Sequence, residues 1–234
     1  MRPIYGFSIR NDGNMSFKSP ESDKLVLDRR NAFLKSLSPE LDNLVTLSQV
    51  HGNTVHVVED PKQIERGMEG DGLITMRTDV ALGILTADCL PIIFFDKSGR
   101  GTGIVHAGRV GSSKNISLIA LQKFISLFEI NPDEITVIIG PGIGKCCYEV
   151  REDTLHPFEK EFPDIKKIAT PGPGKSWKLD LVTVNEFQIL RAGISPGNIV
   201  KINLCTSCRS EFYSYRRDQT DERFLSVIAL KEQL

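Results

Sequence analysis

Short apolar runs separated by glycine-containing turns fill much of the first half of the chain. Residues 44–52 and 53–60 are rich in Val, Thr and Leu with a Gly-Asn pair between them, which predicts a hairpin or two successive strands. Buried strands are also predicted for three later apolar runs, residues 70–76, 81–96 and 101–109. The 81–96 run, ALGILTADCLPIIFFD, is long enough for one or two strands.

Helical spacing of apolar positions occurs in four other segments. The pattern predicts a helix from residue 23 to 34 that Pro39 ends, and an amphipathic helix over 113–128. The segment 181–194 predicts a further helix, and 154–163 a shorter one.

The two ends of the chain and its centre add further strands. A short strand is expected among the turns of residues 1–20, a buried strand within 134–144, and a strand on each side of an irregular segment after residue 198. The chain contains no low-complexity linker and no sharp change in composition. We therefore predict a single α/β domain with mixed sheets that spans residues 1–234.

Charge and composition exclude several classes of partner. The chain has 29 Lys and Arg against 30 Asp and Glu, so no global field favours nucleic acid or an acidic membrane surface. Its N-terminus lacks the apolar region of a signal peptide, and no stretch approaches the roughly 20 apolar residues of a membrane span. A cytoplasmic location is predicted. Five cysteines, an odd number, favour reduced thiols over a disulfide framework.

Three candidate zinc ligands stand at the ends of predicted strands: His51 in QVHG, Cys89 in TADC and His106 in VHAG. Imidazole and thiolate suit Zn²⁺, and three protein ligands leave a fourth position open for water or substrate. However, their separations match no short zinc motif, and a cysteine in an apolar run is commonly just buried. His56 and His156 are assigned to no site.

The other four cysteines are predicted to be ordinary thiols. Cys205 and Cys208 have CxxC spacing, but no second CxxC completes a four-cysteine zinc site. Cys146 and Cys147 are adjacent, and on an extended strand they would point to opposite sides and chelate one ion poorly. They end GPGIGKCC, which lacks the GK[ST] ending of a phosphate loop and is predicted to be a tight turn.

The segment YSYRRD near the C-terminus is a candidate for binding an anion and a planar base. The guanidinium groups of Arg216 and Arg217 could hold an oxyanion bidentately while the ring of Tyr215 stacks on the base. The alternative is a solvated edge that carries an Arg-Asp pair.

The order of these motifs resembles that of the laccase-domain family, also called polyphenol-oxidase-like or YfiH-like proteins. The resemblance covers essentially the whole chain. It rests on SQVHGNTVHVV, GDGLIT, LGILTADCLPIIFFD, GIVHAGRVG, IGPGIGKCCYEV, LDLVTVNEFQILRAGI, NLCTSC and FYSYRRDQTDER.

The resemblance implies layered mixed β-sheets flanked by helices and one zinc ion per chain, held at a catalytic site by His51, Cys89 and His106. It also implies purine nucleoside chemistry: phosphorolysis of adenosine, inosine, guanosine and S-methyl-5'-thioadenosine, and hydrolytic deamination of adenosine. Small-molecule nucleosides and phosphate would be the partners, with Arg216 and Arg217 as candidates for the phosphate. The oligomeric state is left open.

Two departures from the family pattern bear on substrate preference. Arg109 stands where the family usually has Trp after HAG, and residues 220–223 read TDER where TGR is usual. Other roles attached to the family are copper-dependent polyphenol oxidation and peptidoglycan precursor editing, and a zinc-stabilised regulatory protein is the non-enzymatic alternative. Four histidines cannot supply both a His₂Cys copper site and a further histidine-rich copper cluster, which disfavours laccase chemistry.

Overall fold

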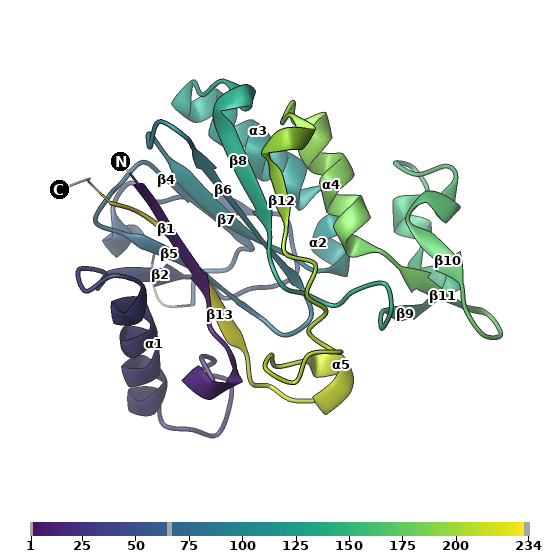
Figure 1. Ribbon diagram of the computed structural model, residues 1–234, viewed down its shortest axis with the longest axis horizontal. Helices are drawn as coiled ribbons and strands as arrows, with labels where there is room; N and C mark the ends of the chain where they lie inside the picture. Colours follow the sequence, from purple (N-terminus) through teal and green to yellow (C-terminus); the bar gives the residue numbers. More distant parts are fainter. Residues whose placement is uncertain (1, 65–66, 232–234) are drawn as a thin grey trace.

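A mixed sheet of six strands runs through the centre of the computed structural model, which describes residues 2–64 and 67–231 (Figure 1). In spatial order the strands are β12 (Ile199–Lys201), β8 (Ile135–Ile139), β6 (Leu90–Asp96), β7 (Thr102–Ala107), β4 (Gly72–Thr75) and β3 (Val55–Val57). β3 and β12 pair parallel with their neighbours, and the inner pairs are antiparallel.

Two further sheets accompany the central one. The larger contains, in spatial order, β1 (Arg2–Phe7), β13 (Phe224–Lys231), β5 (Ala81–Thr86) and β2 (Leu44–Thr46). The smaller lies at one edge of the molecule and contains β10 (Ala169–Pro171), β11 (Ser176–Leu179) and β9 (Glu149–Arg151) (Figure 1). The helices are α1 (Asp23–Leu37), α2 (Arg109–Ser113), α3 (Ile116–Phe128), α4 (Leu181–Arg191) and α5 (Tyr215–Asp218).

Alternation along the central strands divides the core into layers. On β6, Ile93 packs with Ile228 of β13 between the two large sheets. Its neighbours Ile92 and Phe94 point to the other face, where the Phe94 ring meets that of Phe124 on α3 edge to face, with 5.1 Å between centroids. The outer face of the second sheet is covered by α1, which buries Leu34 there. The sheets are thus sandwiched between helices.

The structure confirms the predicted mixed α/β fold and decides two open alternatives. β2 and β3 belong to different sheets, so they are successive strands and not a hairpin. The run 81–96 divides into β5 and β6, also in different sheets, and the chain turns at residues 87–89. The division leaves Cys89 in a turn between the sheets. The 1–234 boundary and the cytoplasmic location stay predictions.

One predicted helix is wrong. Residues 154–163 form short 3₁₀ turns, among them Glu152–Thr154 and His156–Phe158, where an α-helix was expected. Pro157 removes a backbone donor from the middle of this segment, which prevents a continuous helical ladder. Within the described ranges, no helix is long and apolar enough to cross a membrane.

The contact between β7 and β6 leaves no room for a side chain at Gly103. A Cβ atom there would lie 2.4 Å from two ring atoms of Phe94, its cross-strand partner. We predict that Gly103→Ala lowers the free energy of unfolding by about 1–3 kcal/mol, measured by urea denaturation. Gly197→Ala is the matched control, because apart from its two chain neighbours no described residue has an atom within 4 Å of its Cβ position, and it should shift stability by less than about 0.5 kcal/mol. Equal losses in both variants would contradict this packing.

Candidate metal centre and pocket

Three side chains from separate elements meet at one end of the two large sheets. His51 lies in the turn that follows β2, Cys89 in the turn between β5 and β6, and His106 on β7. One ligand atom of each lies within 4.8 Å of the others. The two imidazole rings are arranged edge to face, with 4.8 Å between centroids. The structure therefore brings together the three residues that the sequence singled out.

One residue of this group, and one residue next to it in sequence, have unusual backbone angles. His51 has a φ of 57° and Asp88 a φ of 94°, in the left-handed region that L residues rarely adopt. Such conformations cost about 1–3 kcal/mol each and persist only where the surroundings fix them. For Asp88, the carboxylate accepts the Thr206 hydroxyl at 2.7 Å and the Arg216 backbone N–H at 2.6 Å. These bonds hold the turn that presents Cys89.

The buried carboxylate of Asp71 holds the two histidines. It accepts the backbone N–H groups of His51 at 3.0 Å and Gly52 at 2.6 Å, which fixes the turn. It also lies 2.8 Å from Nδ1 of His106. Burial alone would raise the pKa of Asp71, but the bonds from His106 and Gly52 outweigh it and lower that pKa, so the group is ionised. An ionised carboxylate only accepts, so Nδ1 of His106 donates to Asp71 and Nε2 is the ring nitrogen turned toward Cys89.

Cys89 and His106 form a mutually stabilising charge pair. Burial would raise the pKa of the Cys89 thiol, but His106 and His51 outweigh it and lower that pKa to about 6. Burial would likewise lower the pKa of His106, whereas the Cys89 charge and the Asp71 hydrogen bond raise it to about 9. The thiol is thus readily deprotonated, as a metal ligand must be.

The glycine of the HAG motif is required by close packing. A Cβ atom on Gly108 would lie 2.7 Å from Sγ of Cys89 and 3.1 Å from Cδ2 of His51. Only a residue without a side chain lets α2 begin directly against these two groups.

These three side chains fit a transition metal ion. A thiolate and two imidazoles suit zinc, and they suit copper as well. With Nδ1 of His106 turned toward Asp71, Nε2 is the ring nitrogen on the side of Cys89 and His51, and a metal ion there would replace its proton. All three line one cavity, so a fourth ligand position would open toward a substrate.

The cavity has a volume of about 460 Å³, within the range of small-molecule sites. Its lining combines aromatic, cationic and small polar side chains, including Tyr148, Tyr215, Lys18, Arg216, Arg223, Thr86, Ser48 and Gln49. The Thr86 hydroxyl is buried and has no hydrogen-bond partner among the residues that the structure describes.

Arg216 and Arg217 have different surroundings. The Arg216 guanidinium lies 5.3 Å from the centroid of the Tyr148 ring and donates to the Glu149 carbonyl at 2.9 Å, at the cavity wall. Arg217 does not line the cavity; its guanidinium binds the Asp218 carboxylate and donates to backbone carbonyls, including that of Thr206 at 2.8 Å. This arrangement favours a loop-stabilising role for Arg217 over phosphate binding. Tyr215 is half exposed at the cavity wall.

Arg109, which replaces the family's usual Trp, interacts with Tyr148. Burial and the charge of Cys89 raise the pKa of the Tyr148 phenol, and the Arg109 and Arg216 charges oppose the rise without cancelling it. The phenol is therefore protonated at neutral pH and can donate.

Sequence reasoning missed Asp71, Lys18 and Arg223. For Asp71 a signal was present, because an acidic residue between two glycines directly precedes the buried strand β4 in GDGLIT. Lys18 and Arg223 are more than two hundred residues apart and meet because the chain segments next to β1 and β13 lie together. No local pattern marks them.

The comparisons with known proteins agree over nearly the whole chain. The model of the family described as multi-copper polyphenol oxidoreductase laccase matches residues 5–231. A purine nucleoside phosphorylase from Clostridium acetobutylicum is 35% identical over 232 residues, covering 97% of this chain and 92% of that protein. A protein named adenosine deaminase RL5, from an unknown prokaryotic organism, is 30% identical over 202 residues, covering 82% of this chain and 76% of that protein.

A solved structure has the same fold. The crystal structure of the Bacillus licheniformis hypothetical protein YfiH matches with a TM-score of 0.90 at 30% identity, covering 98% of this chain and 93% of that chain.

The role of Asp71 can be tested by an isosteric change. Asp71→Asn should weaken zinc binding by about 10–100-fold, because the amide no longer fixes the His106 tautomer. The measurement is the zinc dissociation constant, by competition with a chromophoric chelator, in a Cys208→Ser background, because the Cys208 thiol lies within 3.6 Å of the Cys146 and Cys147 thiols and this group could also bind zinc. Asp79→Asn, which changes an exposed carboxylate paired with Arg77, is the control. Equal dissociation constants for the two variants would remove Asp71 from this role.

Proposed function

The chain belongs to the family described as multi-copper polyphenol oxidoreductase laccase, and we propose that it is a zinc-dependent enzyme acting on purine nucleosides. The reactions proposed are phosphorolysis of adenosine, inosine, guanosine and S-methyl-5'-thioadenosine, and hydrolytic deamination of adenosine. Relatives named purine nucleoside phosphorylase and adenosine deaminase support this choice. The observation that carries it is the convergence of His51, Cys89 and His106 on one cavity of nucleoside-compatible size.

In this proposal His51, Cys89 and His106 hold the zinc ion, and Asp71 orients His106. A zinc ion in such a site acts as a Lewis acid and lowers the pKa of bound water, which serves attack on a purine carbon or stabilisation of a leaving base. Cys89 acts as a ligand and not as the attacking nucleophile. These residues together make the catalytic centre.

The remaining cavity residues bind and orient the substrates. Tyr148 and Tyr215 offer aromatic faces on which a purine can stack. Arg216, Lys18 and Arg223 place three cations around the cavity, which suits a phosphate dianion. The protonated Tyr148 phenol can donate to a developing negative charge.

Copper-dependent polyphenol oxidation is the competing function, because the family description names it. The chain has four histidines, and only His51 and His106 line the cavity. His56 instead bonds the Glu69 carbonyl at 2.8 Å, and His156 lies in a 3₁₀ turn. A single chain therefore lacks the histidine-rich cluster that oxygen reduction by copper requires.

The metal role is tested by a pair of histidine variants. His51→Ala should lose the zinc of this centre and reduce nucleoside turnover by at least about 100-fold, because a catalytic zinc needs its three protein ligands. His56→Ala is the matched control and should keep both the zinc ion and the nucleoside turnover. Metal content is measured by elemental analysis, and adenine, inosine and hypoxanthine are separated by chromatography after incubation with adenosine, with and without phosphate. Full turnover in His51→Ala would overturn the proposal, and copper content with oxygen uptake on a phenol would favour the competing one.

The phosphate role of Arg216 is tested by phosphate kinetics. Arg216→Ala should raise the phosphate KM for inosine cleavage by about 10–100-fold, since a charge-assisted hydrogen bond contributes about 1.5–3 kcal/mol. Arg151→Ala removes a fully exposed guanidinium and should leave the phosphate KM unchanged. An unchanged KM in Arg216→Ala would exclude Arg216 as the phosphate ligand.

A further inference from the structure

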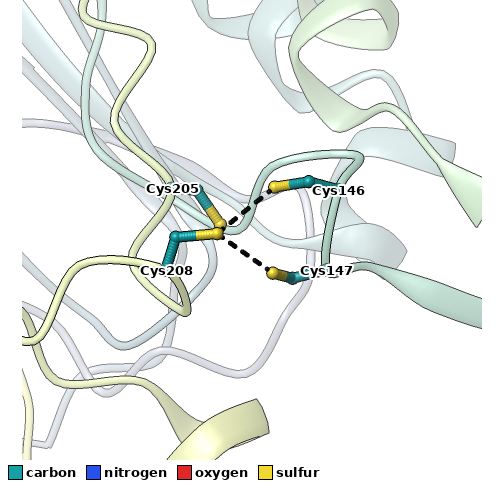
Figure 2. A group of neighbouring side chains, drawn as sticks. All are labelled: Cys146, Cys147, Cys205 and Cys208. Carbon is teal, nitrogen blue, oxygen red and sulfur yellow. Dashed lines mark hydrogen bonds between the residues drawn. The ribbon is translucent and has the colours of Figure 1, made fainter.

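Four of the five cysteines converge at a second place, formed by two loops. Cys146 and Cys147 come from the loop after β8, and Cys205 and Cys208 from the loop between β12 and α5. Figure 2 shows the four side chains pointing toward one another from the two loops. All four Sγ atoms lie within 4.8 Å of one another. The cluster shares no residue with the His51, Cys89 and His106 centre.

The local backbone explains why adjacent cysteines can share a ligand. The sequence predicted that Cys146 and Cys147 would point to opposite sides of a strand, and this is wrong. Residues 145–147 form a turn in which the N–H groups of Cys147 and Tyr148 both donate to the Gly144 carbonyl at 3.0 Å. A turn presents both thiols on the same side. The chain has no second CxxC, as the sequence analysis stated, but the adjacent pair Cys146 and Cys147 lies beside Cys205 and Cys208 instead.

The spacing of the sulfur atoms fits a single tetrahedral ion. Sγ of Cys208 lies 3.3 Å from that of Cys147 and 3.6 Å from that of Cys146. A zinc ion with four Zn–S bonds of about 2.3 Å has sulfur atoms roughly 3.8 Å apart along each edge of the tetrahedron. A disulfide needs about 2.05 Å, and the cysteines are free. A two-iron or four-iron cluster would spread the four thiolates further, since they would be divided among two or more iron ions.

Hydrogen bonds and packing prepare Cys205 to be a thiolate. The backbone N–H of Gly144 donates to Sγ of Cys205 at 3.2 Å, a bond that stabilises a thiolate. A Cβ on Gly144 would lie 3.3 Å from Sγ of Cys146 and 3.2 Å from Cβ of Cys205, so a glycine lets the loop close on the thiols.

We propose that Cys146, Cys147, Cys205 and Cys208 form a closed tetrathiolate site for a second zinc ion, with a structural role. Four soft thiolates favour zinc over the oxygen-preferring ions Mg²⁺ and Ca²⁺, and with four protein ligands no position remains for a substrate.

The site would fasten together two loops that form one wall of the cavity. Their backbones already pair: the Gly142 N–H donates to the Leu204 carbonyl at 3.2 Å, and the Thr206 N–H to the Gly142 carbonyl at 3.0 Å. The first loop supplies Ile143 and Tyr148 to the cavity, and the second leads into Tyr215 and Arg216. An ion held by both loops would fix the spacing of these groups. This inference does not depend on which reaction the cavity performs.

The test counts metal ions per chain. Protein is purified under reducing conditions without chelator, and native mass spectrometry gives the zinc stoichiometry of the full chain. Wild type should carry two zinc ions, and Cys208→Ser should lose one while keeping the other. Ser207→Ala is the matched control, because Ser207 is next to Cys208 and is not a proposed ligand. This variant should keep two zinc ions per chain. Cys146→Ser, on the other loop, should reproduce the loss.

The outcomes separate the two metal sites. Cys89→Ala should keep one zinc ion, and the double variant Cys89→Ala/Cys208→Ser should keep none. This result is expected whether or not any nucleoside is turned over. If Cys89→Ala keeps the wild-type count, the first centre is wrongly assigned, and the Cys208→Ser result still decides the second. Equal stoichiometry in wild type and Cys208→Ser would overturn the tetrathiolate site. So would a mass deficit of two hydrogens, which marks a disulfide within the cluster.

A spectroscopic readout confirms the ligand set. Replacing the remaining zinc of Cys89→Ala by Co²⁺ should give the strong visible bands and sulfur-to-metal charge transfer of tetrahedral thiolate coordination. Both should be lost in Cys89→Ala/Cys208→Ser, while circular dichroism reports whether that variant is folded. Weak bands typical of octahedral oxygen coordination in Cys89→Ala would contradict the assignment.

Discussion

The arrangement of the first centre depends on one buried carboxylate. Asp71 receives hydrogen bonds from the turn that carries His51 and from the ring of His106, so a single group sets the position of one histidine and the tautomer of the other. Burying a charge without partners is costly, and here four donors compensate for the lost water. The same bonds hold His51 in a backbone conformation that would otherwise be unfavourable.

The two loops at the cysteine cluster connect the first centre to the cavity wall. Asp88, directly before Cys89, accepts hydrogen bonds from Thr206 and Arg216, and its own carbonyl accepts the Ile143 N–H at 2.7 Å. The turn that presents Cys89 is thus bonded to both loops. The hydrogen bonds of Asp88 therefore link the loops of the cysteine cluster to the turn that carries Cys89.

Much of the fold, and the three residues of the first centre, could be predicted because local sequence patterns indicate them. Alternation and helical spacing identified most of the central strands and three of the helices, and small residues beside His51 and His106 marked accessible strand ends. The predictions that failed concern side chains whose surroundings come from distant segments of the chain. The thiols of Cys146 and Cys208 are 62 positions apart, and only the β8 and β12 pairing brings their loops together. Arg217 looked like Arg216 in sequence, yet the carbonyls that occupy its guanidinium come from a loop whose path no periodicity reveals.

The pairing of β4 with β7 has a consequence for folding. Besides its side-chain bonds, Asp71 accepts the His106 backbone N–H through its own carbonyl at 2.7 Å, so strand register and ligand geometry are set by the same two residues. A one-residue slip would turn His106 to the opposite face of the sheet. An ion that binds only when His106 faces the site would stabilise the native register of β4 and β7 over a shifted register.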